Sequence, residues 1–458
     1  MSISKSQQSS SSPSAPPRGG IASFQMPRVA QWLSSSALDI EANTKQSQGN
    51  SSVGKLKKDG LAKKLLLRQF NSMSRGYLLL KENGEKQAYG NLLSLEQGFA
   101  KAEIVVNDEA VYQRMLINGV LGAAEGYMEG EWTTPDLLSV IRFFVSNLNE
   151  LQEINRKRSW FNRAALASLS WINRNTLQRS KKNICAHYDL GNDFFSLFLD
   201  PTLLYSAAIF SDEDMTLEQA SIAKLDRLCR KLELKPQDHL LEIGTGWGAM
   251  AVYAAEIYGC SVTTTTISEE QYNYATQLVK EKGLQNRVTV LKKDYRALEG
   301  TYDKLVSVEM IEAVGHQYYQ QYFSHCSKLL KPSGLMAIQA ITIPDQRYKL
   351  AQKSVDFIKR YVFPGGCLPS LSVIANHVRQ DTDMVLSDVF DITEDYAKTL
   401  SVWRESFFSK IEDVRALGFD QRFINMWEYY LCYCEGGFRE RVIGTHQIVM
   451  AKPDYRKV

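Results

Sequence analysis

Residues 239–249 read His-Leu-Leu-Glu-Ile-Gly-Thr-Gly-Trp-Gly-Ala, and this stretch decides the fold class. The apolar residues 239–243 predict a short strand, which runs directly into a turn with glycines at 244, 246 and 248. The helical pattern of residues 248–258 follows at once. Glycines at such a turn let the backbone come close to a ligand at the carboxyl end of a parallel strand. The stretch therefore predicts a cofactor site in an α/β fold.

Strand and helix patterns alternate along the rest of the C-terminal region. This alternation predicts βαβ units and a parallel sheet that helices cover on both faces. We therefore expect a doubly wound, Rossmann-like α/β domain over residues 183–458. Further strands are expected at 261–266, 288–291, 303–308 and 335–341, and further helices at 268–282 and 317–330.

The region before this domain divides into three segments of different composition. Residues 1–58 are rich in Ser, Gln, Pro and Gly and are expected to form a disordered tail. Residues 59–150 predict a small α+β N-terminal domain, and residues 151–182 a basic amphipathic linker. The strands of the small domain are expected at 76–80 and 102–106, and its helices at 111–121 and 137–144.

The overall composition is that of an ordinary globular protein. The chain has 458 residues, of which 44% are hydrophobic and 23% charged, and its net charge is +3. Its apolar runs are shorter than the ~18 residues that span a bilayer, and its start lacks the apolar core of a secretory signal. Seven cysteines without a CxxC pair indicate a reducing compartment and no structural metal. We therefore expect a cytoplasmic protein, and the small net charge gives no argument for a nucleic-acid partner.

Positive charge is concentrated in residues 156–182. Eight Lys or Arg and no acid are interleaved there with Trp160, Phe161, Leu169 and Trp171. Such a segment suits an anionic lipid surface, where Trp and Leu enter the headgroup boundary while Arg stays at the phosphates. The alternative is a linker helix whose apolar face packs on its own protein.

The glycine turn alone does not separate NAD from S-adenosylmethionine, because with Ala249 it also fits a dinucleotide fingerprint. Glu242, inside the strand before the turn, suits the ammonium group of a methionine moiety better than a pyrophosphate. The second strand ends in Thr266 rather than in the acid that an NAD ribose needs. Asp294, after the third strand, can accept a hydrogen bond from an adenine amino group. These features favour S-adenosylmethionine.

Several motifs follow one another along the C-terminal region. They are His187-Tyr-Asp-Leu-Gly-Asn-Asp-Phe-Phe195, Tyr205-Ser206, Glu242-Ile-Gly-Thr-Gly-Trp-Gly248, Ser307-Val-Glu-Met-Ile-Glu312-Ala-Val-Gly-His316 and Phe363-Pro-Gly-Gly-Cys-Leu-Pro369. This series resembles the cyclopropane-fatty-acyl-phospholipid synthases and their mycolic acid methyltransferase relatives. The resemblance runs from about residue 183 to residue 452, and stretches 339–345 and 356–371 look more like the plant synthases.

The resemblance implies a class I S-adenosylmethionine-dependent methyltransferase. Carried over residue by residue, it implies cofactor contacts from Tyr205, Ser206, Gly244, Gly246, Thr266, Ile267, Gln271 and Tyr295. Glu242, Gly248 and Asp294, whose positions at strand ends and at the turn point to a ligand, complete the predicted cofactor site.

In bacterial members of the resembled family, a Cys, a Glu, a His in a His-Thr-Ile run and a Tyr hold a bicarbonate ion. The resemblance matches Glu312, Ile341 and Tyr396 to that pattern. Ala207 stands where the Cys is expected and Gln339 where the His is expected, and the plant synthases share the Gln. The resemblance therefore leaves bicarbonate binding as an open question, while the expected fold and methyl donor are unaffected.

Methyl transfer to an unactivated cis double bond places strict demands on a site. The reaction leaves positive charge on carbon, so the site must exclude water and offer negative charge or aromatic faces. Ring closure then needs a base that removes a proton from the added methyl group. Glu312, just after the fourth strand, is expected to hold or act as that base. Tyr396, positioning the anion or base, and Gln339 complete the predicted catalytic residues.

The expected function is methylene transfer to an unsaturated phospholipid acyl chain at a membrane surface, which forms a cyclopropane ring. A methyl-branched fatty acid as product, or methylation of a small amine, stays open as an alternative. A catalytically inactive lipid-binding protein and a dehydrogenase are the remaining interpretations. A homodimer is also left open.

Neutralising residues 156–182 tests the lipid-surface interpretation. Replacing their Lys and Arg by Gln should weaken binding to anionic vesicles at low salt. The difference should shrink at high salt, because screening already weakens the attraction there. Vesicle flotation at two salt concentrations measures this, and unchanged binding at low salt would favour the packed linker helix.

Overall fold

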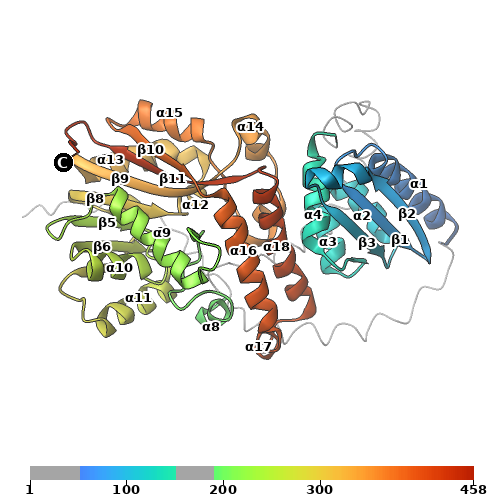
Figure 1. Ribbon diagram of the computed structural model, residues 1–458, viewed down its shortest axis with the longest axis horizontal. Coiled ribbons are helices and arrows are strands. Elements are labelled where there is room, and N and C mark those ends of the chain that lie inside the picture. The colour runs from blue at the N-terminus through green and yellow to red at the C-terminus, as the bar shows by residue number, and fades with distance from the viewer. Residues whose placement is uncertain (1–51, 151–189, 458) are drawn as a thin grey trace, which may run out of the picture. The chain divides into compact units, whose positions relative to one another are not determined.

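The computed structural model describes residues 52–150 and 190–457 (Figure 1). The predicted linker at 151–182 lies outside these ranges. The motif that begins at His187 lies within them only from residue 190 onward. The predicted tail also lies outside them, except that helix α1 (Ser52–Phe70) begins at Ser52. Among the described residues, no helix is both long and apolar enough to cross a bilayer.

The N-terminal part contains a four-stranded sheet with the order β2-β1-β3-β4. Strands β1 (Tyr77–Glu82) and β2 (Glu85–Gly90) form an antiparallel hairpin, and β3 (Lys101–Val106) runs parallel to β1. Asn83 and Gly84 at the hairpin turn have φ angles of 49° and 83°, as an Asn-Gly turn favours. The remaining elements are α2 (Ala110–Asn118), α3 (Val120–Met128), β4 (Trp132–Thr133) and α4 (Leu137–Ser146).

The second sheet has seven strands in the order β10-β11-β9-β8-β5-β6-β7. The pairs β5–β6, β6–β7, β5–β8 and β8–β9 are parallel, whereas β11 runs antiparallel to both β9 and β10. This confirms the doubly wound α/β class. The strands are β5 (His239–Ile243), β6 (Ser261–Thr266), β7 (Val288–Lys292), β8 (Tyr302–Val308), β9 (Leu330–Thr342), β10 (Val385–Asp391) and β11 (Gly444–Ala451).

Both faces of the large sheet are buried by helices. Leu240 belongs to the apolar cluster under one set of helices, and the next residue, Leu241, to the cluster under the other. This alternation follows from the two-residue period of a strand. The first face is covered by α9 (Leu217–Lys231), α10 (Ala249–Ile257) and α11 (Glu269–Glu281), and the second by α13 (Tyr319–Leu329) and α15 (Leu371–Asp381).

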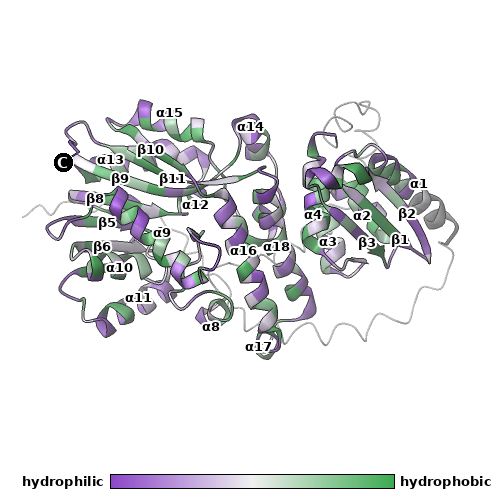
Figure 2. Cartoon of the chain, in the orientation of Figure 1, coloured by the Kyte–Doolittle hydropathy of each residue, from purple (hydrophilic) through white to green (hydrophobic). Residues whose placement is uncertain are grey.

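Two long helices, α16 (Thr393–Ser409) and α18 (Gln421–Arg439), pack against each other. Each buries a tryptophan, Trp403 and Trp427 respectively. Figure 2 shows hydrophobic and hydrophilic residues alternating along both helices, as expected of helices with one buried face. The shorter helices are α8 (Asn192–Ser196), α12 (Ile311–Val314), α14 (Asp345–Lys353) and α17 (Ile411–Ala416).

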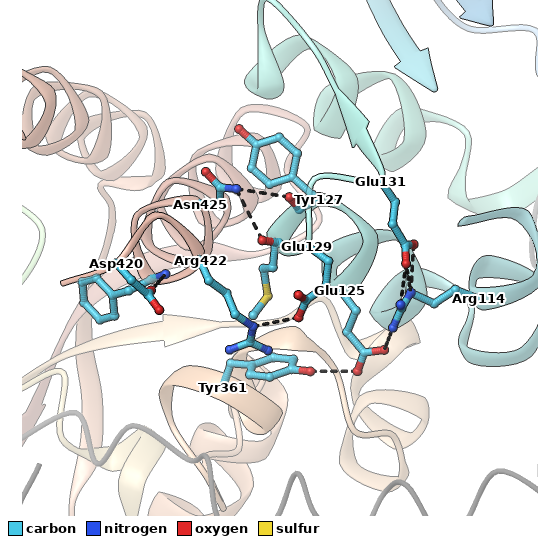
Figure 3. A network of polar contacts seen from close by, with 11 residues as sticks. Arg114, Glu125, Tyr127, Glu129, Glu131, Tyr361, Asp420, Arg422 and Asn425 are labelled. Atoms are coloured by element: carbon cyan, nitrogen blue, oxygen red, sulfur yellow. Dashed lines mark hydrogen bonds and ion pairs between the residues drawn. The ribbon is translucent and has the colours of Figure 1, made fainter. Parts of the chain in front are cut away.

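Helices α3 and α4 contact α18, and a set of polar contacts accompanies this packing (Figure 3). The Tyr127 hydroxyl donates to a Glu428 carboxylate oxygen at 2.7 Å, and Arg422 pairs with Glu129 at 2.7 Å. Tyr361, in the segment after α14, donates to Glu125 at 2.7 Å. Residues 125–129, at the end of α3, therefore supply side chains that tie the helices of the smaller sheet to residues of the C-terminal region.

The prediction of one continuous helix over 111–121 is wrong. The structure has two helices, α2 and α3, which meet at Gly119. Gly119 has φ 59° and ψ −130°, a conformation that breaks a helix and that glycine adopts easily. Apolar periodicity continues through the break, which is why the pattern suggested a single helix.

Two glycine substitutions test the packing of α18 on α4. A Cβ at Gly436 would lie 2.7 Å from the Ile141 Cγ2 atom, whereas a Cβ at Gly60 in α1 would meet nothing within 4 Å. Gly60→Ala should stabilise the protein by about 0.5–1 kcal/mol through helix propensity. Gly436→Ala should destabilise it by about 1–3 kcal/mol, because overpacking outweighs that gain. Urea unfolding of both variants measures the difference, and a stabilising Gly436→Ala would contradict the packing described.

Candidate active site

The predicted glycine turn lies at the carboxyl end of β5. Gly244, Gly246 and Gly248 have φ angles of 102°, 52° and 94°, a region that side chains disfavour. A Cβ at Gly248 would lie 3.1 Å from the Ala275 Cβ atom, so glycine lets α10 approach α11. A Cβ at Gly246 would meet nothing within 4 Å. The turn is therefore bounded by packing on one side and open on the other.

The end of β6 lies beside this turn, because the Gly244 amide donates to the Thr265 carbonyl at 3.1 Å. Thr266 ends the strand, and its hydroxyl donates to the Gln271 side chain at 2.8 Å. Ile267, the next residue, is 76% exposed although it is a large apolar side chain. An exposed apolar side chain at the ligand-binding edge of the sheet is suited to stack on a flat ring of the ligand. The structure thus brings Thr266, Ile267 and Gln271 together next to the glycines.

Asp294 and Tyr295 follow β7, whose end is paired with that of β6. Asp294 pairs with Arg296 at 2.6 Å, and this pairing lowers the pKa of Asp294. Tyr295 packs edge-on against Tyr322, with ring centroids 5.6 Å apart. The predicted cofactor residues Thr266, Ile267, Asp294 and Tyr295 therefore lie at or just after neighbouring strand ends, and Gln271 lies in the first turn of α11.

A buried acid, Glu242, and a buried base, Lys224, lie near the turn. Glu242 is 3% exposed, and one of its oxygens has no hydrogen-bond partner among the described residues. Burial raises the pKa of Glu242 to about 8, against the opposing effects of a hydrogen bond from Thr264 and the charge of Lys224. Lys224 is fully buried and donates to the Ser206 hydroxyl at 2.6 Å. A buried carboxylate with an unused oxygen fits a cationic ligand group such as an ammonium.

Tyr205, the residue before Ser206, belongs to an aromatic cluster. Its ring stacks on Trp403 with centroids 5.1 Å apart, and it also contacts Phe195 at 5.2 Å. Its hydroxyl is 2.7 Å from the hydroxyl of Tyr430 in α18. Tyr205 and Ser206 therefore join the aromatic helices α16 and α18 to the polar residues under the glycine turn.

A second acidic group, Glu309, lies directly after β8. One of its carboxylate oxygens accepts hydrogen bonds from the Ala207 amide at 2.9 Å and from the Gln339 side-chain amide at 2.7 Å. The other oxygen accepts from the Tyr396 hydroxyl at 2.8 Å. The predicted residues Gln339 and Tyr396 are thus brought together, but around Glu309 and not around Glu312.

The orientation of Gln339 is set from its other side. Its carbonyl oxygen accepts from the Gln447 amide at 2.9 Å, and Gln447 in turn accepts from Arg227 at 2.6 Å. Arg227 extends to Asp388 at 3.4 Å. Because Gln339 is fully buried, this chain of bonds fixes its amide nitrogen toward Glu309.

Glu312, the expected base, lies in the first turn of α12. One oxygen accepts from the Ile341 amide at 2.5 Å, and the other is buried without a partner among the described residues. Burial, followed by the negative charge of Glu309, raises the pKa of Glu312 to about 8. At neutral pH Glu312 therefore mostly carries a proton, and Glu309 is the better candidate for the ionised member of the pair.

Sequence reasoning missed Glu309 and Lys224. The signal for Glu309 was present, since Glu309 and Glu312 are two acids three residues apart directly after a strand end. Such a pair at the ligand edge of a parallel sheet is a pattern for acid–base chemistry. No local signal marks Lys224, which lies on an ordinary amphipathic helix.

The structure also contains an open cavity of about 350 Å³ near α8. It is lined by residues 192–203 and by Tyr274, and none of the predicted site residues lines it. Across residues 52–150 and 190–457, no group of His, Cys, Asp and Glu side chains is arranged to hold a metal ion.

Glu242→Gln tests the buried carboxylate. The unfolded carboxyl ionises near its ordinary pKa of 4.5, while the folded one keeps its proton until about pH 8. Wild-type stability should therefore fall relative to Glu242→Gln between about pH 5 and pH 8. The variant should also bind S-adenosylmethionine more weakly. Thermal unfolding across this pH range and calorimetric titration measure the two effects, and parallel pH profiles would contradict the assignment.

The chain was compared with known proteins. Residues 175–448 match the family model described as mycolic acid cyclopropane synthetase. The chain is 38% identical over 347 residues to tuberculostearic acid methyltransferase UfaA1 of Mycobacterium tuberculosis, covering 74% of this chain and 80% of the relative. It is also 38% identical over 356 residues to cyclopropane-fatty-acyl-phospholipid synthase of Escherichia coli, covering 78% and 89%.

Solved structures agree with this result. The cyclopropane synthase MmaA2 from Mycobacterium tuberculosis is 31% identical, with a TM-score of 0.55 over 59% of this chain and 98% of that one. The mycolic acid cyclopropane synthase CmaA1, solved in complex with SAH and CTAB, is 33% identical, with a TM-score of 0.55 over 59% and 97%. The chain therefore belongs to the mycolic acid cyclopropane synthetase family and is an S-adenosylmethionine-dependent methyltransferase of lipid modification.

Proposed function

We propose that the protein transfers the methyl carbon of S-adenosylmethionine to the cis double bond of an unsaturated phospholipid acyl chain and closes a cyclopropane ring. The observation that carries this proposal is a pair of half-buried acids, Glu309 and Glu312, next to the glycine turn. Gly244 lies against Met310, with only 3.5 Å between a Cβ built at Gly244 and the Met310 Cγ atom. The acids on either side of Met310 are therefore close to where a donor over the turn would present its methyl group.

The donor site in this proposal consists of the residues that gather at the strand ends. Glu242 receives the ammonium group, Gly244, Gly246 and Gly248 accommodate the methionine moiety, and the strand ends hold the nucleoside. Tyr205 and Ser206 close the site from the other side. The nucleoside contacts come from Thr266, Ile267, Gln271, Asp294 and Tyr295.

Aromatic rings around Tyr205 support a cationic reaction. The stack of Tyr205 on Trp403, and the nearby Tyr430, provide electron-rich faces within a largely buried cluster. Such faces stabilise a carbocation and exclude the water that would trap it. A methyltransferase for a soluble amine would not need this protection, since an amine nitrogen attacks the donor without forming a carbocation.

A methyl-branched product is the second candidate. The relative from Mycobacterium tuberculosis is named for tuberculostearic acid and the one from Escherichia coli for a cyclopropane, and both are 38% identical to this chain. Both products begin with the same methyl transfer. Direct loss of a proton from the added methyl group closes the ring, whereas a 1,2-hydride shift before that loss gives a methylene branch, which only a reductant converts to a methyl branch. The likeness to the plant synthases, which share the Gln at position 339, supports the cyclopropane product.

The experiment is incubation of the protein with S-adenosylmethionine and vesicles of unsaturated phospholipid. We expect an acyl product that is heavier by one CH₂ and survives ozonolysis, because a cyclopropane has no double bond. A methylene-branched product has the same mass but is cleaved by ozone, and it is the branched product expected without a reductant. Such a product would replace cyclopropane by branching, and turnover of a soluble amine without lipid turnover would reject the proposal.

A further inference from the structure

The Glu309 carboxylate is itself an anion, and both of its oxygens accept hydrogen bonds from the surrounding chain. Three neutral donors converge on its carboxylate: the Ala207 amide at 2.9 Å, the Gln339 amide at 2.7 Å and the Tyr396 hydroxyl at 2.8 Å. They come from the loop before α9, from β9 and from α16. A carboxylate that accepts several such bonds is stabilised in its charged form. The site thus holds one negative charge that belongs to the chain itself.

The residues present do not fit a bound bicarbonate. Gln339 and Tyr396, at two of the positions implied to hold that ion, both donate to Glu309. The Ile341 amide donates to Glu312, and Ala207 offers a methyl group in place of a thiol. A second anion would therefore find these donors in use and would lie beside the negative charge of Glu309. No step of the reaction is assigned to bicarbonate here.

The backbone of Glu309 supports a specific role for its side chain. Its φ angle is 49°, in the left-handed region where a residue with a Cβ is strained by about 1–2 kcal/mol and glycine is not. Its amide donates to the Gln339 carbonyl at 2.7 Å. Glu309 is therefore bonded to Gln339 through its backbone as well as through its side chain. Strained residues of this kind concentrate at functional sites.

We propose that the Glu309 carboxylate is the built-in anion of the active site and the base that completes ring closure, in place of an exogenous bicarbonate. This proposal rests on the proposed function. In the closing step, the electron pair of a C–H bond of the transferred methyl group forms the second bond to the cationic carbon. The proton from that bond goes to a carboxylate oxygen of Glu309. No oxidant or reductant is needed.

Neighbouring groups suit Glu309 to this role. Burial raises the pKa of Glu309 above its ordinary value, although its hydrogen bonds oppose that shift, and a raised pKa favours proton uptake. Gln339 cannot titrate, and the Gln447–Arg227 chain keeps its amide group directed at Glu309. The proton released by the substrate therefore reaches the carboxylate and is not intercepted by Gln339. Glu312, protonated beside it, adds no second negative charge, and the positive charge of the buried Lys224 favours the ionised form of Glu309.

The first experiment needs no lipid substrate. ¹³C-labelled bicarbonate is titrated into the wild-type protein and into Glu309→Gly, and binding is followed by ¹³C NMR line broadening and by calorimetry. Glu309→Gly removes both the carboxylate and the backbone strain. We expect no saturable binding to the wild type and saturable binding to the variant. Saturable binding to the wild type would overturn the proposal, even if the protein proved to act on another substrate.

The second experiment measures proton removal during turnover of phospholipid vesicles. Glu309→Gln, which keeps the shape, should lower the rate of cyclopropane formation by roughly 10²-fold or more. S-adenosylhomocysteine affinity should stay within a few-fold of the wild type. Formate should partly restore the rate of Glu309→Gly, since it can occupy the vacated position. Glu405→Gln, at an exposed position of the same helix as Tyr396, is the control and should behave as the wild type.

The two experiments separate the possible failures. A wild-type rate that falls when dissolved carbon dioxide is removed, or a Glu309→Gln variant with a normal rate, would overturn the role of Glu309. A wild type that modifies no lipid at all would instead reject the proposed function. The bicarbonate titration would still decide whether Glu309 is the resident anion.

Discussion

One half-buried carboxylate and its hydrogen bonds constrain the whole catalytic end of this protein. Glu309 sits at the end of a central strand, where it cannot be left without hydrogen-bond partners except at a large cost in free energy. Its partners come from three separate segments of the chain. Each segment is therefore held in place by the same group: the loop with Tyr205 and Ser206, the strand with Gln339, and the helix that carries the aromatic residues.

The same constraint explains why the site is both polar and apolar. Methyl transfer to an alkene requires a dry space, but a dry space raises the cost of any charge inside it. The protein meets both demands by giving its buried acids specific partners. Glu309 has three neutral donors, Glu312 has one backbone amide, and Glu242 lies near Lys224. Groups of this kind reduce stability in the absence of ligand, which is a common compromise between stability and activity.

Much of this arrangement could be predicted from the sequence, because its signals are local. The strand, the glycine turn and the helix around residues 239–258 are contiguous, so their geometry follows from residue types at short spacing. The same is true of Thr266 and Asp294, which lie at the ends of predicted strands, whereas Ile267 was implied by the family resemblance. The structure places all three at one edge of the sheet, and their roles stay predictions.

The network around Glu309 could not be predicted in this way. Its partners lie 102, 30 and 87 residues away in the sequence, so no local pattern links them. The sequence showed Ala207 and Gln339 only as departures from an expected ligand set. In the structure both residues donate to Glu309, and under our proposal that side chain supplies the charge that the expected ligands would hold.

The most direct test of this account is a crystal structure of the protein with S-adenosylhomocysteine. We expect its sulfur to lie over the turn at Gly246, with the direction of the missing methyl group pointing toward Glu309. A sulfur atom that instead faces open solvent, or that is separated from Glu309 by packed side chains, would contradict the account.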